Sequence, residues 1–452
     1  MNPIRRFDHL SEGVLVMKLL LLLSAIIVVT ALSVRAQQST TLTLEKAVQL
    51  ALEKNTSVIE AQNNLTGRQS AVQASFGRFL PSVDASGSYS SNTNWISPLE
   101  GVNSKTYSAG LSSNVVLFDG FANTSRFSAA KSDASSAEYL LTRAQQATIY
   151  GTHVFFLKVV QTYELLKVNE DNLKRSQRQL ERITESNKVG AVALADVYRQ
   201  QVQVGTDELN LIQAQNNYEK AKADLVANLG VDFNTEYVSD FSGIPTEIDT
   251  AEFSPLNARY ADFSNLRTLI DSKRPDYQST IQSYNSADAS VVIARAGHYP
   301  SVNANLSYGG SSNNDFSRLS DSKSLHFGMT VTLPIFSGFS TQSQIEQAEI
   351  FRKNADEEVK KKRRDMTVEL RKALLDLEAA EKQVSVTKSS VASAEEDRKI
   401  AEEKYSLGAG TLLDLLIANA NYTTALSNKV NTAINYLLSK KQLEFVLGTI
   451  SK

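Results

Sequence analysis

Two aspartates follow glycines at the same spacing in two distant parts of the chain. Gly190 and Asp196 lie in "KVGAVALADV", and Gly408 and Asp414 lie in "SLGAGTLLDL". Glycine supplies the left-handed backbone that ends a helix and closes a turn. An aspartate just after such a turn caps the next helix or opposes its dipole. Each phrase therefore predicts the tip of a helical hairpin.

The apolar residues inside these two phrases have two readings. They either pack the hairpin tip, as any helical hairpin requires, or they form a contact surface for another protein. Both readings stay open for Val192, Leu194, Leu412 and Leu413.

Residue types for most catalytic and metal chemistry are scarce. The chain has no cysteine, which excludes disulfides, thiolate metal sites, a cysteine nucleophile and a lipid on an N-terminal cysteine. Its histidines are scattered, and His298 and His326 are interpreted as structural because neither has a partner at metal-ligand spacing. No Ser/His/Asp arrangement or glycine-rich phosphate loop stands out. The sequence therefore predicts neither an enzyme nor a cofactor or metal site.

Charge does not favour a nucleic-acid partner. The formal net charge of the 452 residues is −2. The basic run at 360–364 is flanked by Asp356, Glu357, Glu358 and Asp365 on the same expected helix. This pattern is typical of a solvated helix face, so we expect no nucleic-acid binding.

The two glycine phrases belong to an internal duplication. Three further matches keep an offset of 218 or 219 residues: 78–83 with 297–302, 117–121 with 335–339, and 229–230 with 447–448. Each half is therefore expected to run helix, strand, strand, long helix, turn, helix. At the junctions of strands and helices stand Pro81, Pro300, Gly120 and Gly338.

Proline placement and heptads predict very long helices. No proline occurs in 121–230 or 335–452, and proline costs about 3 kcal/mol inside a helix. A helix over 121–189 would be about 100 Å long. Coiled-coil periodicity is carried by Val159, Leu166, Leu173 and Leu180, and by Leu377, Ala380, Val384, Thr387, Val391, Ala394, Ala401 and Tyr405.

Four segments between the helices alternate apolar and polar residues, which predicts strands over 82–90, 107–118, 301–309 and 325–334. Strands of about ten residues with one apolar face suit a transmembrane β-barrel, and equally an ordinary sheet that covers a core. Aromatic residues at or near the strand ends fit an interfacial girdle: Tyr89, Trp95, Tyr107, Phe118, Phe316 and Phe336. Four strands cannot close a barrel, and open edges in lipid leave backbone groups unpaired. Strands that span a membrane would therefore require an oligomer that shares one barrel.

The N-terminus has the pattern of an export signal. Lys18 precedes a long apolar run, and Val34-Arg35-Ala36 offers a cleavage site before Gln37. We expect residues 1–36 to be a signal peptide, with Met17 as the natural start. The alternative is an uncleaved anchor over 14–34. No other long apolar run occurs, so we expect the mature chain to leave the cytoplasm without a transmembrane helix.

Together these features resemble the TolC-type outer membrane efflux proteins over residues 40–450. The marks are the proline-led strand starts, the "LFDGF" and "IFSGF" junctions and the paired tips. The resemblance implies a mostly α fold with a transmembrane β-barrel part, in which a homotrimer forms a 12-stranded barrel and a 12-helix tunnel. It implies a first repeat over 37–230, a linking equatorial belt over 231–275 and a second repeat over 276–452. Loops 91–106 and 310–324 would face outside the cell.

The function implied by the resemblance is a passive exit duct in the outer membrane and periplasm of a Gram-negative type envelope. Outer membrane lipid would surround the barrel. A periplasmic adaptor and an inner membrane pump of RND, ABC or MFS type would complete a tripartite efflux or type I secretion system. Two other classes stay open: the adaptor itself, or a structural envelope coiled coil. The sequence does not specify the substrate or the pump.

The resemblance also places a gate at the hairpin tips. Asp414 matches an aperture acid, Tyr405 a gate residue, and Asp196 is the first-repeat counterpart of Asp414. Threefold symmetry would make Asp414 a carboxylate ring that attracts cations and repels anions. The chain departs from the family pattern at Gly410, where a gating arginine would fall, and at Ile417, where a second aperture acid would fall. We therefore expect a single ring and a hydrophobic constriction at Ile417.

Overall fold

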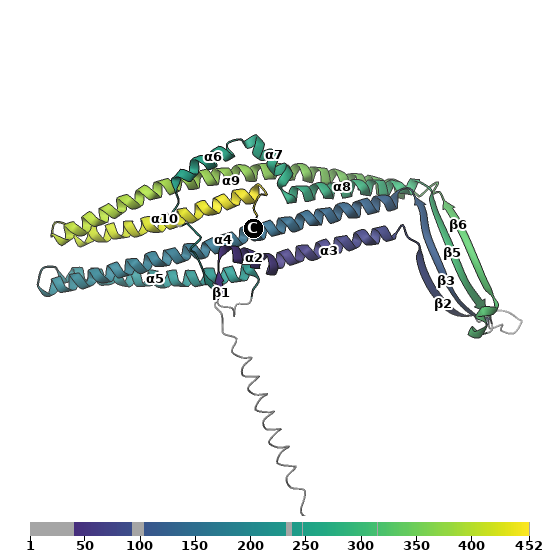
Figure 1. Ribbon diagram of the computed structural model, residues 1–452, viewed down its shortest axis with the longest axis horizontal. Coiled ribbons are helices and arrows are strands. Elements are labelled where there is room, and N and C mark those ends of the chain that lie inside the picture. The colour runs from purple at the N-terminus through teal and green to yellow at the C-terminus, as the bar shows by residue number, and fades with distance from the viewer. Residues whose placement is uncertain (1–39, 93–103, 232–236, 246, 314, 452) are drawn as a thin grey trace, which may run out of the picture.

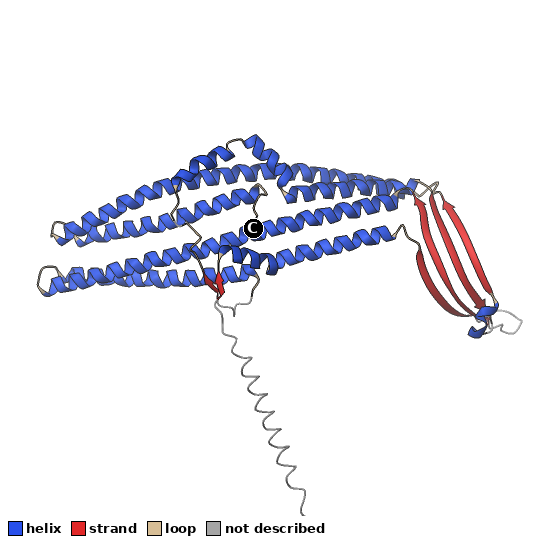
Figure 2. Ribbon diagram, in the orientation of Figure 1, coloured by secondary structure: helices blue, strands red, loops and turns tan. Residues whose placement is uncertain are grey.

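The structure, a computed structural model, describes residues 40–92, 104–231, 237–245, 247–313 and 315–451. The expected signal peptide, Met17 and Trp95 lie outside the described residues. A long body of helices runs from two hairpin tips at one end to a single sheet at the other (Figures 1 and 2). Among the helices that the structure describes, none is both long and apolar enough to cross a membrane.

Two helices of 67 residues run the length of the body, α4 (Ala122–Lys188) and α9 (Ser340–Ser406). They occupy the proline-free heptad stretches, and at 1.5 Å per residue each is about 100 Å long. α4 also packs against α8 and α10 of the second half, which joins the two halves. Shorter helices pack along both long helices. These are α3 (Thr56–Gly77) and α5 (Leu194–Leu229) on α4, and α8 (Pro275–Arg295) and α10 (Leu412–Val446) on α9.

The sheet is antiparallel, in the order β2-β3-β5-β6. Leu306 lies opposite Phe327 and Ala304 opposite Met329, so the apolar side chains share one face, as the alternation predicts. In the described chain β2 and β6 are hydrogen-bonded on one side only, which leaves two edges. The strands are β2 (Ser82–Asn92), β3 (Ser104–Asp119), β5 (Ser301–Ser312) and β6 (Lys323–Thr332).

The predicted loops are shorter than expected because the strands continue into them. β5 extends to Ser312 and β6 begins at Lys323, and the 3₁₀ helix η3 (Phe316–Asp321) lies between them. β3 begins at Ser104, three residues before the predicted start, and β6 ends at Thr332, two residues before the predicted end.

Both passages from sheet to long helix use the same strained turn. Gly120 and Phe121 have φ of 66° and 71°, and Gly338 and Phe339 have φ of 61° and 63°. A left-handed conformation costs a residue with a side chain roughly 1–2 kcal/mol. Pro81 and Pro300 stand directly before β2 and β5, where a fixed φ suits the entry to a strand.

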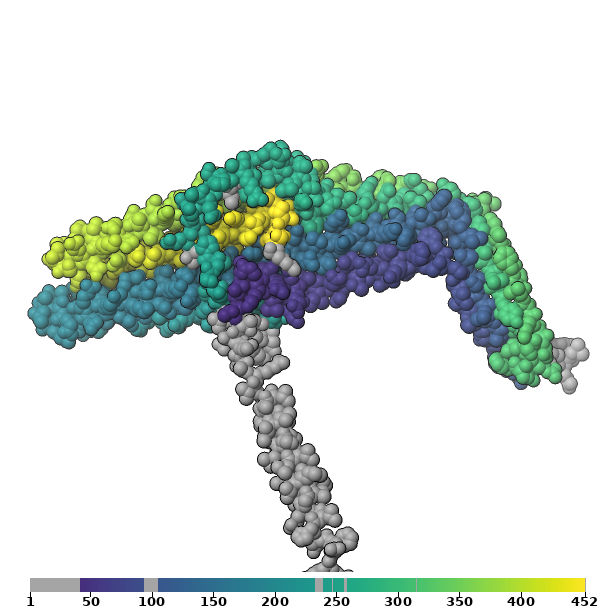
Figure 3. Space-filling view, viewed as in Figure 1, coloured from purple at the N-terminus to yellow at the C-terminus, as the bar shows by residue number. Residues whose placement is uncertain are grey.

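Short elements surround the middle of the helices. The strand β1 (Thr40–Leu42) pairs in parallel with β4 (Tyr237–Ser239). The segment between the halves lies across the waist of the body (Figure 3), with α6 and α7 over α9 (Figure 1). The remaining elements are α2 (Leu44–Lys54), η1 (Thr250–Glu252), α6 (Phe253–Tyr260), α7 (Phe263–Lys273) and η2 (Ala296–His298).

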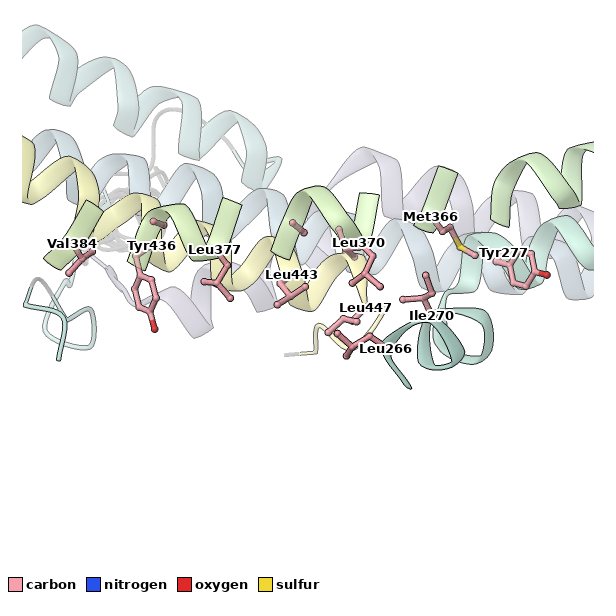
Figure 4. Close-up of a cluster of buried hydrophobic side chains, with 13 residues drawn as sticks. Leu266, Ile270, Tyr277, Met366, Leu370, Leu377, Val384, Tyr436, Leu443 and Leu447 are labelled. Atoms are coloured by element: carbon pink, nitrogen blue, oxygen red, sulfur yellow. The ribbon is translucent and has the colours of Figure 1, made fainter. Parts of the chain in front are cut away.

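Two large apolar clusters lie at this level, together with a smaller one around Val48, Ile149 and Ile450. The first joins α2 to α4 and α5 around Phe156, which is fully buried. The second joins α7 to α9 and α10 around Ile270, Leu370 and Leu443 (Figure 4). The heptad residue Leu377 lies in this second cluster, so the coiled-coil pattern indicates the buried face correctly here.

A buried charge cluster links the halves beside the second core. Arg274, only 1% exposed, donates to Asp276 at 2.6 Å and to Glu369. Lys362 also donates to Asp276, at 2.8 Å. Burial would raise the pKa of Asp276, but the hydrogen bonds from Arg274 and Lys362 and the charge of Arg143 hold it well below its usual range.

The basic run at 360–364 is largely neutralised by these and similar pairs. Lys362 belongs to the buried cluster, and Arg363 pairs with Asp271 at 2.6 Å. Lys360 and Lys361 pair with acids of their own helix. The run is therefore a paired helix face, part of which fastens α9 to the neighbouring α7 and α8.

Two glycines mark where shorter helices meet end to end. Gly230 ends α5 with φ of 69°, and a Cβ there would lie 2.6 Å from the Lys54 carbonyl oxygen. Gly448 follows α10 with φ of 71°, and a Cβ there would lie 2.9 Å from the Lys273 carbonyl oxygen. Both positions require glycine for conformation and for space. The repeat match at 229–230 and 447–448 therefore has a physical cause.

We expect Gly230→Ala and Gly448→Ala each to lower the thermal unfolding temperature, because each adds a left-handed strain of about 1–2 kcal/mol and a backbone clash. Gly205→Ala, inside α5 with open space around it, is the matched control and should raise stability by about 1 kcal/mol. Thermal melts of the detergent-extracted protein check this. Equal melting temperatures for all three variants would contradict the interpretation.

Candidate functional site at the hairpin tips

The two tips lie at the end of the body opposite the sheet (Figure 1). Gly190 and Gly408 have φ of 76° and 73°, and open space surrounds both. The requirement for glycine there is therefore conformational. Ala191 N–H donates to the Ser186 carbonyl at 2.9 Å, and Ala409 N–H donates to the Lys404 carbonyl at 2.8 Å. Both helices thus end in the same hydrogen-bonded turn.

Asp414 takes part in a capping box at the start of α10. Thr411 N–H donates to Asp414 Oδ2 at 3.0 Å, and Asp414 N–H donates to Thr411 Oγ1 at 3.2 Å. The Thr411 hydroxyl also donates to the carboxylate at 2.6 Å. These bonds lower the pKa of Asp414, the hydroxyl contributing most and the backbone N–H next. The carboxylate is therefore charged and held in one place.

Asp196 holds the same position in the first tip without a cap. Ala193 precedes α5 in an extended conformation and offers no side-chain hydrogen bond. Asp196 instead pairs with Arg199 on the next turn, at 3.3 Å. The two tips share their backbone but differ in how their acids are held. The pattern Thr411-x-x-Asp414 is a readable signal for this difference, which the sequence analysis missed.

The apolar residues of the phrases divide between the two readings. Leu412 is buried and Val192 half-buried in one cluster with Ile183 and Val197, which joins the two hairpins. Leu194 and Leu413 are exposed to 54% and 59%. Leu412 and Val192 therefore pack the tip, whereas Leu194 and Leu413 are free in the single chain to contact another.

Tyr405 inserts its ring into the same cluster from α9. Its hydroxyl is buried and has no hydrogen-bond partner. Burial raises the pKa of Tyr405, and the nearby charge of Asp196 raises it further. The structure therefore brings together two of the predicted gate residues, one from each repeat, with the ring in apolar contact.

Gly410 and Ile417, where the chain departs from the family pattern, also have defined places. Gly410 N–H donates to the Lys404 carbonyl at 3.1 Å, and a Cβ at Gly410 would lie 3.1 Å from Lys404 Cβ. Gly410 thus helps close the turn. Ile417 lies in the second turn of α10 and is 52% exposed.

An ionic link between the hairpins lies one turn before Tyr405. Arg182 of α4 donates to Glu402 Oε1 at 2.9 Å, and Arg398 of α9 donates to Glu402 Oε2 at 2.9 Å. The hydrogen bond from Arg182 is the main cause that lowers the pKa of Glu402. Sequence reasoning missed this link because its partners are 220 positions apart.

No cluster of three or more His, Cys, Asp or Glu side chains suited to a metal ion occurs in the described part of the chain. His298 closes η2 and His326 lies within β6. The tips thus offer single carboxylates, apolar contact residues and arginines.

Comparison with known proteins assigns the chain to a family. Residues 47–231 and 266–449 match the outer membrane efflux protein family. The two segments cover more than half of the chain, and the chain belongs to this family. It is an outer membrane efflux protein. Its structural neighbours are outer membrane channels rather than enzymes.

Relatives and solved structures agree with this assignment. The outer membrane protein TolC of Salmonella enteritidis is 24% identical over 374 residues, 78% of this chain and 71% of that protein. TolC of Vibrio cholerae is 24% identical over 386 residues, 84% and 85% of the two chains. The CmeC outer membrane channel of Campylobacter jejuni matches with a TM-score of 0.77 at 22% identity, covering 90% of this chain and 85% of that chain. The MtrE outer membrane channel of Neisseria gonorrhoeae matches with a TM-score of 0.75 at 18% identity, covering 92% and 93%. The fold is therefore the TolC fold.

The unequal caps lead to a prediction for local stability. Thr411→Ala should speed hydrogen exchange at 412–415 about fivefold, because an N-cap is worth about 1 kcal/mol. Ala193→Thr should slow exchange at 194–197 by a similar factor, since the extended backbone of Ala193 suits a cap and Asp196 completes a box. Exchange measured by mass spectrometry on the tip peptides checks both.

The capping box should also depend on pH. The pKa of Asp414 is lower in the folded tip than in the unfolded chain. Its stabilisation is therefore complete above the ordinary carboxyl pKa of about 3.9 and is lost as pH falls through the folded value. An unchanged exchange rate in Thr411→Ala would show that the box does not hold the tip.

Proposed function

We propose that three copies of this chain form one exit duct, with a shared 12-stranded barrel in the outer membrane and a 12-helix tunnel below it. The observation that carries this proposal is the four-stranded sheet with an apolar face and two edges, β2 and β6. In lipid each unpaired edge group costs free energy, and pairing β6 of one copy with β2 of the next removes both edges.

The partners follow from the family and from the exposed tips. A periplasmic adaptor contacts the tips, and an inner membrane pump of RND, ABC or MFS type supplies the substrate. Exposed Leu194 and Leu413 are suited to such a contact. The family relatives include a toluene efflux pump outer membrane protein of Pseudomonas putida, 23% identical over 411 residues. The duct itself is passive in this proposal.

The division of the chain is proposed on the same basis. Residues 37–230 and 276–452 act as two repeats, and 231–275 as the equatorial belt. The equivalent strained turns at Gly120 and Gly338, and the equivalent contacts of Gly230 and Gly448, support this division.

At the entrance, Asp414 forms the carboxylate ring and Ile417 a hydrophobic constriction. The hydrogen bonds from Thr411 keep Asp414 charged and fixed, which suits a ring that selects for cations. The Tyr405 ring holds the two hairpins of one subunit together, with the charge of Asp196 nearby. Because the Tyr405 hydroxyl is unpaired, its ring contact is the part of this lock that stabilises the closed tip.

The native mass of the protein extracted from outer membranes tests the assembly, and its conductance in planar bilayers tests the duct. We expect a trimer that forms cation-selective channels, and Asp414→Asn should lower the cation preference because it removes the ring charge. Asp224→Asn, an exposed acid elsewhere on α5, is the control and should leave it unchanged. A stable monomer would contradict the duct, because four strands cannot close.

Two substitutions of Tyr405 separate its ring from its hydroxyl. Tyr405→Phe should leave the closed-state conductance unchanged, since the hydroxyl has no hydrogen bond to lose. Tyr405→Ala should raise the open fraction, because it removes the ring from the cluster that joins the hairpins. Single-channel recording measures both. Opening by Tyr405→Phe alone would show that the hydroxyl forms the lock in the assembled duct.

A further inference from the structure

A cationic cleft opens beside the tips, between the two hairpins. Its volume is about 530 Å³. One wall is α4 and the other is α9, and Leu415 and Asn419 of α10 form the floor. The walls carry Arg175, Arg178, Arg182 and Arg398, and we call this site the arginine cleft.

The positive charge of the cleft exceeds its negative charge. Four arginines line it, against the two acids Glu181 and Glu402. Arg182 and Arg398 share Glu402. Arg178 donates only to a carbonyl of its own helix, that of Lys174, at 3.2 Å. About two positive charges are therefore left without an acid in the cleft.

Two of the arginines also have unused donors. Arg175 and Arg398 lie on the ring of Tyr422, at 5.6 and 5.3 Å from its centroid. The Nε of each is buried and has no hydrogen-bond partner. Burial lowers the pKa of Arg175, and repulsion from Arg398 lowers it further. Unpaired buried donors and uncompensated charge both favour an added anion.

Three lysines just outside the cleft each have an acidic partner. Lys174 pairs with Asp171 at 3.9 Å, and Lys188 pairs with Glu185 at 2.6 Å. Lys399 pairs with acids of its own helix. These three neighbouring lysines thus have acidic partners, unlike Arg178 of the cleft.

We propose that the arginine cleft receives acidic side chains from a helix of the periplasmic adaptor, so that docking depends on carboxylates of the partner. This inference rests on the proposed function. Arg175, Arg178 and Arg182 follow one another at helical spacing over about 10 Å of α4. A helix laid along this groove can offer acids at the same spacing. Arginine forks bind carboxylates in pairs of hydrogen bonds.

The position of the cleft favours a protein partner from the periplasm. Arg182 lies about 12 Å from the turn at Gly190 by helical rise, and the exposed Leu194 and Leu413 continue the surface at the tips. A helix that enters at the tips would therefore meet apolar residues first and then the arginines. This order matches the usual division of an interface into an apolar contact and an electrostatic selector.

The test uses the full channel in detergent and a dye-labelled helical peptide of about 20 residues with glutamates at i, i+3 and i+7. A second peptide carries glutamines at these positions. Fluorescence anisotropy should show the glutamine peptide binding at least about tenfold more weakly. Arg178→Gln and Arg182→Gln should each weaken the glutamate peptide about fivefold or more, and added salt should do the same. Lys174→Gln, with the same charge change on the same helix, should stay within about twofold.

The outcomes separate the two proposals. Equal binding of both peptides, no binding, or equal effects of Arg178→Gln and Lys174→Gln would overturn the inference. Binding of citrate in the cleft without binding of the peptide would also overturn the inference and would indicate a small-anion site. Native mass and conductance are measured on the same variants. A trimeric, conducting channel that ignores the acidic peptide leaves the duct in place, whereas a monomer removes both.

Discussion

Backbone groups at the edge of a sheet need hydrogen-bond partners wherever water is absent. This chain ends its sheet at β2 and β6, and the apolar side chains of β5 and β6 share one face. A single copy cannot satisfy these edges in lipid, and a shared barrel can. The placement of the long helices follows from that of the strands. Each strand pair leads into α4 or α9 through a turn that the two repeats have in common.

The duplication explains much of the shape but not the behaviour of the tips. Both tips use a left-handed glycine and the same turn hydrogen bonds. Only the second tip has a capping box, between Thr411 and Asp414. The aspartate thus has the same place in the backbone of both tips, but its hydrogen-bond and ion-pair partners differ. We expect the tip without the box to open locally more readily than the tip that has it.

Apolar and ionic contacts between the hairpins have different roles. The cluster around Ile183, Leu412 and the Tyr405 ring is non-directional and tolerates small shifts. The link from Arg182 and Arg398 to Glu402 is directional and sensitive to competing carboxylates. The chain lacks the arginine that the family pattern would put at Gly410, and this link lies one helical turn before Tyr405. Arg182 of α4 therefore lies near the tip, although the turn at Gly410 has no arginine of its own.

Proline gaps, heptads and alternation were enough to predict the long helices and the four strands, because each is a local pattern repeated over many residues. The duplicated order came from motifs repeated at a constant offset, and the same motifs carried the resemblance to the family. The left-handed glycines at 190 and 408 were also readable, since their backbone conformation is a local property. Contacts between residues far apart in the chain were not. The Arg182–Glu402 link depends on how α4 packs on α9, and the buried Arg274–Asp276–Lys362 cluster on how α8 packs on α9. The burial of Leu412 beside an exposed Leu413 depends on how α10 packs in the tip. Such contacts follow from helix rotation and register, which a periodic sequence leaves free and only tertiary packing decides.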